Sequence, residues 1–196
     1  MKTIIKSGIW KLLKLFYDNR NSALHLREIA RKTKMNESGI SRYLNSLVKE
    51  EILTEENEGN MRKFYLNKQA VPKIFPIYDL EKLENLPLLR KNAIKLYLEK
   101  LNKKPVIALV FGSTAKETYK QDSDIDILEI VNDKQDNSNA RKFAEAQTGI
   151  KIQIFQIVLD KFKDELKMKK DKVVQSAVET GFPVFNNKYY YEVIYG

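Results

Sequence analysis

Two short apolar segments, the second carrying acidic residues at alternate positions, constrain this chain more than any other feature. The run from Val106 to Phe111 is apolar and β-branched, typical of a buried strand, and it is followed by Gly112-Ser113. Ten residues later, a second segment begins with Asp124-Ile125-Asp126-Ile127. Because side chains alternate across a strand, we expect Asp124 and Asp126 on one face and the isoleucines on the other.

This spacing predicts a site for a metal-bound nucleotide. Carboxylates two residues apart in a strand lie ~6–7 Å apart and can share hard divalent cations such as Mg²⁺ or Mn²⁺. Such ions bind a triphosphate and neutralise the charge that develops at its α-phosphorus. Gly112 and Ser113 offer backbone N–H groups and a hydroxyl to phosphate oxygens. The predicted site therefore comprises Gly112, Ser113, Asp124 and Asp126, with the two aspartates as metal ligands and catalytic carboxylates.

The same residues resemble the signature of the DNA polymerase β-like nucleotidyltransferases, and most closely the minimal nucleotidyltransferases. The resemblance covers about residues 104–194, including a closing helix, glycine and short strand that end near Phe185. It implies transfer of a nucleoside monophosphate from an NTP to an acceptor hydroxyl. Because minimal nucleotidyltransferases often act as antitoxins, the resemblance also implies a HEPN-type toxin as a partner.

One position departs from the family pattern. Active members carry a third acid in a later strand, at the centre of an apolar–acid–apolar triplet, and Gln153 stands at that position here. A glutamine cannot accept a proton from an attacking hydroxyl and binds Mg²⁺ less well than a carboxylate. Alternation turns Glu129 away from Asp124, so it is a poor substitute. Two functions stay open: an active nucleotidyltransferase, or a domain that binds nucleotide without turnover.

The first part of the chain is basic. The net charge is +9, and residues 1–75 hold 15 Lys and Arg against 8 Asp and Glu. A basic first part beside a neutral second part suggests contact with a polyanion. A lysine-rich surface without a specific partner is the alternative.

Periodicity in this part predicts three amphipathic helices and a hairpin. The helices are expected over Thr3–Asn19, Leu26–Thr33 and Glu37–Glu51, with Asn36 capping the third. Strands are expected over Ile52–Glu55 and Met61–Leu66, around a turn at residues 57–60. This order resembles the winged helix-turn-helix domain of MarR-like and ArsR-like regulators over residues 3–67, which also favours a homodimer.

The winged-helix resemblance implies a DNA-binding surface. Its residues lie on the outer face of the third helix and on the hairpin: Ser38, Ser41, Arg42, Asn45, Arg62 and Lys63. Short polar side chains and an arginine suit the major groove, and basic residues of a wing suit phosphate or a minor groove. Acidic residues in the hairpin, Glu55, Glu56 and Glu58, would oppose DNA. A protein–protein or purely structural role for this domain therefore stays open.

Together these patterns predict an α+β protein of two domains. A winged helix-turn-helix domain is expected over residues 1–70, a helical connector over 71–103, and a nucleotidyltransferase-like domain over 104–196, with a mixed sheet flanked by helices. Within the connector, residues 71–86 contain two prolines and are expected to be irregular, before a helix from Pro87 to about Leu101.

Composition excludes several classes of site. The absence of cysteine excludes disulfides and thiolate chemistry, and a single histidine, His25, excludes a zinc site built from several histidines. The chain lacks an apolar stretch long enough to cross a membrane, and its first residues do not resemble a secretion signal. We therefore expect a cytoplasmic protein that does not associate with membranes.

Overall fold

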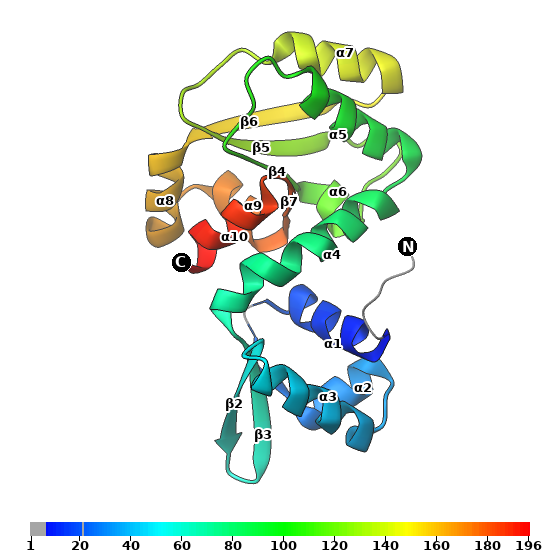
Figure 1. The fold of residues 1–196 in the computed structure, drawn as a ribbon. Helices are drawn as coiled ribbons and strands as arrows, with labels where there is room; N and C mark the ends of the chain where they lie inside the picture. The colour runs from blue at the N-terminus through cyan, green and yellow to red at the C-terminus, as the bar shows by residue number, and fades with distance from the viewer. Residues whose placement is uncertain (1–6, 21) are drawn as a thin grey trace. The chain divides into compact units, whose positions relative to one another are not determined.

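A computed structural model of the chain describes residues 7–20 and 22–196. These residues form two compact units (Figure 1), the first extending to Tyr78 and the second from Asp79 to Ile194. The expected α+β class is confirmed, since both units combine helices with a sheet. Among the described residues, no helix combines the length and apolar character required to cross a bilayer.

The first unit places three helices beside a three-stranded antiparallel sheet of order β1-β3-β2. Its core includes Leu12, Phe16, Ile29, Ile40 and Phe64, all almost fully buried. Its elements up to Leu66 are α1 (Ser7–Asp18), β1 (Leu24–His25), α2 (Leu26–Thr33), α3 (Glu37–Lys49), β2 (Leu53–Glu58) and β3 (Met61–Leu66).

Most predicted elements of this unit are confirmed. Helix α2 has the predicted bounds, and Asn36 caps α3 by accepting a hydrogen bond from the backbone N–H of Gly39 at 2.7 Å. The expected start of the first helix at Thr3 falls outside the described residues.

Two details of the sheet differ from the prediction. The two-residue strand β1 was not expected from so short a segment; it forms because Leu24 is buried and pairs with Phe64. Strand β2 also runs to Glu58 instead of ending at Glu55, which reduces the turn to Gly59 and Asn60. Cross-strand pairs of opposite charge, such as Glu56 with Lys63, favour this longer pairing.

The expected irregular segment is a helix. A short 3₁₀ turn, η1 (Lys68–Ala70), leads into helix α4 (Val71–Asn85), which continues through Pro76. Proline removes one hydrogen bond from the helix, but Val71, Phe75 and Tyr78 recur at helical spacing and are buried to at least 99%. Apolar burial on one helix face outweighs the missing hydrogen bond, and the boundary between the units falls within α4.

The second unit contains a mixed four-stranded sheet of order β6-β5-β4-β7, in which only β5 and β6 are parallel. The strands are β4 (Ile107–Phe111), β5 (Ile125–Val131), β6 (Ile152–Val158) and β7 (Phe182–Phe185). The helices are α5 (Leu88–Lys100), α6 (Gly112–Lys116), α7 (Ser138–Thr148), α8 (Leu159–Met168), α9 (Lys172–Thr180) and α10 (Asn187–Tyr195).

Helices cover both faces of this sheet. Helices α5 and α7 lie side by side over one face, and α8, α9 and α10 lie on the other side (Figure 1). On the face covered by α5 and α7, Ile125 and Ile127 belong to a core that includes Ala93, Ile94 and Tyr97. The predicted alternation along β5 is therefore confirmed, and Asp126 faces the opposite side.

Candidate functional site

The carboxylate pair lies where β5 begins. Asp124 immediately precedes β5, and Asp126 pairs with Phe111, the last residue of β4. Burial raises the pKa of Asp126 above its ordinary value, and the negative charge of Asp124 raises it further. Two acidic groups thus lie close enough to repel one another, and a bound cation would relieve that repulsion.

Gly112 is held directly against Asp126. Its φ is +66°, in the left-handed region that favours glycine. A Cβ at this position would collide with Oδ2 of Asp126. Ser113 follows in the first turn of α6, where it is half-buried. The structure thus brings Gly112, Ser113 and Asp126 to the same end of the two central strands, beside Asp124.

Replacing Gly112 with alanine is expected to lower the free energy of unfolding by about 1–3 kcal/mol, the cost of a strained backbone conformation, with the clash against Asp126 added. Gly149→Ala is the matched control, because Gly149 also has a positive φ, +71°, but open space where its Cβ would lie. Chemical denaturation of both variants separates the two effects. An equal loss in both would show that contact with Asp126 does not constrain position 112.

Gln153 lies beside the carboxylate pair. In the parallel pairing of β5 and β6, Asp126 is opposite Gln153, so both side chains project from the same face. The position that resembles the third acid of the family therefore adjoins Asp126 in space, and it holds an exposed amide.

Glu129 belongs to a separate, buried network on the opposite face of β5. Its carboxylate is fully buried and accepts hydrogen bonds from Tyr97 Oη at 2.6 Å, Asn137 Nδ2 at 2.8 Å and Gln156 Nε2 at 2.8 Å. Burial, and then the hydrogen bond to Glu129, raise the pKa of Tyr97. Because three donors already occupy it, Glu129 cannot replace the acid missing at position 153.

The two carboxylates suit a metal ion that is also coordinated by the phosphates of a nucleotide. Within the described part of the chain, no group of three or more His, Cys, Asp or Glu side chains could hold a metal ion. Mg²⁺, however, is commonly held by one or two carboxylates together with substrate phosphates and water. Asp124 and Asp126 fit that arrangement.

Sequence reasoning missed one residue near this site. Arg90 of α5 is 3% exposed and contacts the loop of residues 117–124 that leads to Asp124. A single arginine in the first turn of a helix carries no sequence signal for such a contact, since the contact joins segments about 30 residues apart.

The residues predicted to bind DNA form hydrogen bonds with one another. Arg62 makes two bonds to the Glu55 carboxylate, from Nε at 2.6 Å and from Nη2 at 2.7 Å. It also donates to Oγ of Ser41 at 3.2 Å and to Oδ1 of Asn45 at 2.6 Å. Glu55 thereby neutralises Arg62 and holds it against α3.

The remaining residues of this surface differ in their surroundings. Lys63 pairs with Glu58 at 3.2 Å, whereas Arg42 is exposed on α3. The Ser38 hydroxyl contacts Oδ1 of Asn36 at 3.2 Å, next to the helix cap. Three of the six predicted DNA contacts, Ser41, Asn45 and Arg62, therefore form one cluster. That cluster also contains Glu55, a residue expected to oppose DNA.

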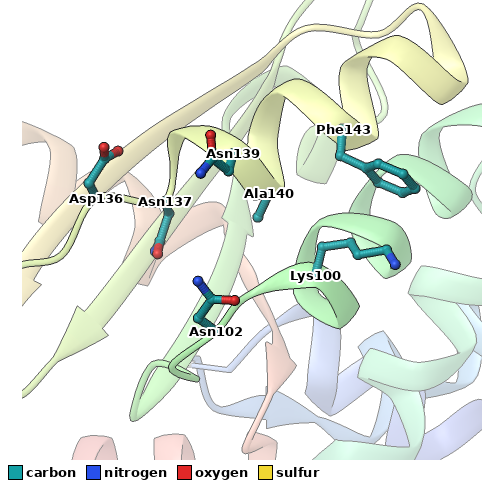
Figure 2. Close-up of a pocket in the computed structure, with 7 residues that line it drawn as sticks. All are labelled: Lys100, Asn102, Asp136, Asn137, Asn139, Ala140 and Phe143. Atoms are coloured by element: carbon teal, nitrogen blue, oxygen red, sulfur yellow. The ribbon is translucent and has the colours of Figure 1, made fainter.

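A separate pocket of about 240 Å³ lies beyond the other end of β5, near the start of α7. Figure 2 shows the side chains of Asn102 and Asn137 directed toward one another across it, while Asp136 points away. Lys100 and Phe143 also line the pocket. None of the residues predicted to bind nucleotide, metal or DNA lines it, so it is distinct from the site at Asp124 and Asp126.

Comparison with known proteins supports the assignment of the second unit. Residues 92–188, just under half of the chain, match the family model described as Polymerase beta, Nucleotidyltransferase. This match includes both strands and the loop that carry Gly112, Ser113, Asp124 and Asp126. No curated protein matches the chain.

A solved structure is also similar. It is a crystal structure from Rhodococcus sp. RHA1, described as that of a candidate transcriptional regulator, with 20% sequence identity and a TM-score of 0.31. The alignment covers 65% of this chain and 44% of that one, so the chain spans less than half the length of the regulator.

Proposed function

We propose that the nucleotidyltransferase domain at residues 92–188 binds an NTP with Mg²⁺ or Mn²⁺ and transfers its NMP group to a hydroxyl-bearing acceptor. The observation that carries this proposal is the position of Gly112 against Asp126, with Asp124 alongside, at the junction of β4, α6 and β5. This arrangement brings the Asp126 carboxylate against the backbone at the start of α6 and pairs it with Asp124, which suits a cation bound to phosphate.

Each residue has a distinct role in this proposal. Asp124 and Asp126 would hold the metal ion, which supplies charge neutralisation at the phosphates when bound. Gly112 allows the triphosphate to approach the start of α6, and the Ser113 hydroxyl donates a hydrogen bond to a phosphate oxygen. Strands β4 and β5 keep these groups in place, because every residue of β4 is buried and so are all residues of β5 except Asp126.

Calorimetric titration with ATP, in the presence and absence of Mg²⁺, tests the binding step. We expect binding in the presence of the metal and little without it, because the two carboxylates repel a bare triphosphate. Wild-type protein that binds no ATP under either condition would contradict the proposal.

Gln153 favours a second function. It lies beside Asp126, at the position where a carboxylate would act as the general base. In this alternative, the domain binds nucleotide without turnover and the chain is a DNA-binding regulator or antitoxin. Release of pyrophosphate from ATP, measured with water or an added hydroxyl compound as the acceptor of the NMP group, distinguishes the two functions. Binding with release supports the enzyme, and binding without release to either acceptor supports the regulator.

For the first unit we propose a winged helix-turn-helix that binds DNA. The order α1-β1-α2-α3-β2-β3 and the three-stranded sheet support this, as does the excess of basic residues in the first part of the chain. Helix α3 would enter the major groove and the β2–β3 hairpin would lie along the backbone.

Glu55→Gln is expected to strengthen DNA binding about 3- to 10-fold, because it removes the charge that neutralises Arg62. The number of counterions released on binding, given by the slope of log K against log salt concentration, should rise by about one. Glu56→Gln is the matched control. It removes the same charge from the same strand, but Glu56 interacts with Tyr65 instead of Arg62. Binding to a duplex by fluorescence anisotropy at several salt concentrations measures both. Equal effects would attribute the change to net charge alone.

A further inference from the structure

We propose that Arg90 is a positioning residue for the nucleotide site: it holds the loop of residues 117–124 in the conformation that presents Asp124 beside Asp126. This inference rests on the function proposed above and assigns a role to a residue outside the motif. Arg90 lies in the first turn of α5, 22 positions before Gly112 in the sequence.

The Arg90 guanidinium joins three points of the site. Nη1 donates to the Thr114 hydroxyl in α6 at 2.9 Å, and Nη2 donates to the carbonyl oxygens of Lys120 at 3.1 Å and Ser123 at 2.7 Å. Its Cζ also lies 4.2 Å from the centre of the Tyr119 ring. The side chain thus connects the helix that begins at Gly112 to both ends of the turn before Asp124.

The turn itself is built to receive these bonds. The Ser123 N–H donates to the Lys120 carbonyl at 3.2 Å, and the Ser123 hydroxyl accepts from the Lys120 N–H at 2.8 Å. The Lys120 carbonyl therefore accepts hydrogen bonds from both the Ser123 N–H and Arg90 Nη2, which joins the turn to Arg90. Asp124 is the next residue, so the conformation of the turn determines the backbone position from which the Asp124 side chain extends.

Removing the Arg90 guanidinium from water costs free energy, which contacts with polar and aromatic groups must offset. Arg90 is 3% exposed, and desolvation lowers the pKa of its guanidinium, while Tyr119 and the carboxylate of Asp124 favour the charged form. Arg90 makes no ion pair shorter than 4.0 Å among the described residues; two carbonyl groups, a hydroxyl and an aromatic ring satisfy it. The Thr114 hydroxyl oxygen and the carbonyl oxygens of Lys120 and Ser123 lie in different directions from Arg90. The planar guanidinium has several N–H donors that reach all three, whereas the single ammonium group of a lysine does not.

Arg90→Lys and Arg90→Met test this role. Both variants lose the three-point connection, but Arg90→Lys keeps the charge. We expect both to bind ATP with Mg²⁺ at least about tenfold more weakly than wild type, and amide hydrogen exchange to speed up at residues 118–124 while β4 and β5 keep their protection. The preferential change in the loop separates positioning from general loss of stability.

Lys95→Met is the matched control on the same helix. It removes the same charge, but Lys95 is half exposed and pairs with Glu84 at 2.6 Å, away from the loop. We expect its ATP affinity and its loop exchange to match those of wild type.

Three results would overturn the inference. If Arg90→Lys binds ATP like wild type while Arg90→Met does not, the residue acts through its charge rather than by positioning. If both variants keep wild-type affinity and loop exchange, Arg90 has no role at the site. If wild-type protein fails to bind ATP with Mg²⁺, the proposed function fails first, a result distinguishable because it appears without any substitution.

Discussion

Replacing Gln153 with glutamate is expected to raise the rate of pyrophosphate release from ATP by about 10²–10⁴-fold, the usual contribution of a positioned general base. Gln153 pairs with Asp126 in the parallel register of β5 and β6, so a carboxylate at this position would join Asp124 and Asp126 on one face. Glutamate has nearly the same shape as glutamine, and the side chain is exposed, so the strand can accept it. The rate would be measured with water or an added hydroxyl compound as acceptor.

Gln156→Glu is the control for this substitution. It makes the same chemical change on the same strand, but Gln156 projects from the opposite face and donates to the buried Glu129 carboxylate at 2.8 Å. We expect no gain in rate and a lower stability, because a second carboxylate would replace that donor. If Gln153→Glu binds ATP but releases pyrophosphate no faster than wild type, position 153 does not hold the missing base.

The substitutions Asp124→Asn and Asp126→Asn are each expected to weaken Mg²⁺-dependent binding of ATP at least about 100-fold. A ligand to the metal is lost in each case, and even partners of metal ligands contribute about 10- to 100-fold to metal affinity. Calorimetric titration with and without Mg²⁺ measures the loss, and Asp122→Asn, an exposed acid in the same loop, is the matched control. Unchanged affinity in both variants would mean that the two carboxylates are ordinary surface acids.

Loss of binding in Asp126→Asn should not come from unfolding. The pKa of Asp126 is raised by burial and by Asp124, so the folded state holds the proton more tightly than the unfolded state does. The ionised carboxylate therefore destabilises the folded protein at neutral pH, and this cost disappears as pH falls below the unfolded-state pKa. A neutral asparagine removes the same cost, so we expect an unchanged or higher melting temperature at pH 7.

Local patterns predicted much of the fold. The bounds of α2 and β3 follow from local residue patterns, and the Asn36 cap follows from side-chain chemistry that acts over three residues. The prediction of an irregular segment at residues 71–86 is wrong. Pro72 lies in the first turn of α4, where its missing N–H breaks no hydrogen bond, and burial of Val71, Phe75 and Tyr78 on one face outweighs the bond lost at Pro76. Strand β1 was missed because two residues carry no periodicity.

The sequence by itself determined the chemistry of the candidate site: which residues are acidic, that Asp126 faces away from Ile125 and Ile127, and that a glycine and a serine follow the preceding strand. These depend on spacing along the chain, and alternation in a strand is a local property. Only the tertiary structure decided that Gln153 adjoins Asp126, that Arg90 holds the loop before Asp124, and that Glu55 neutralises Arg62. Each of these contacts joins separate elements of the fold, and their formation depends on strand register and helix packing, which no local pattern specifies.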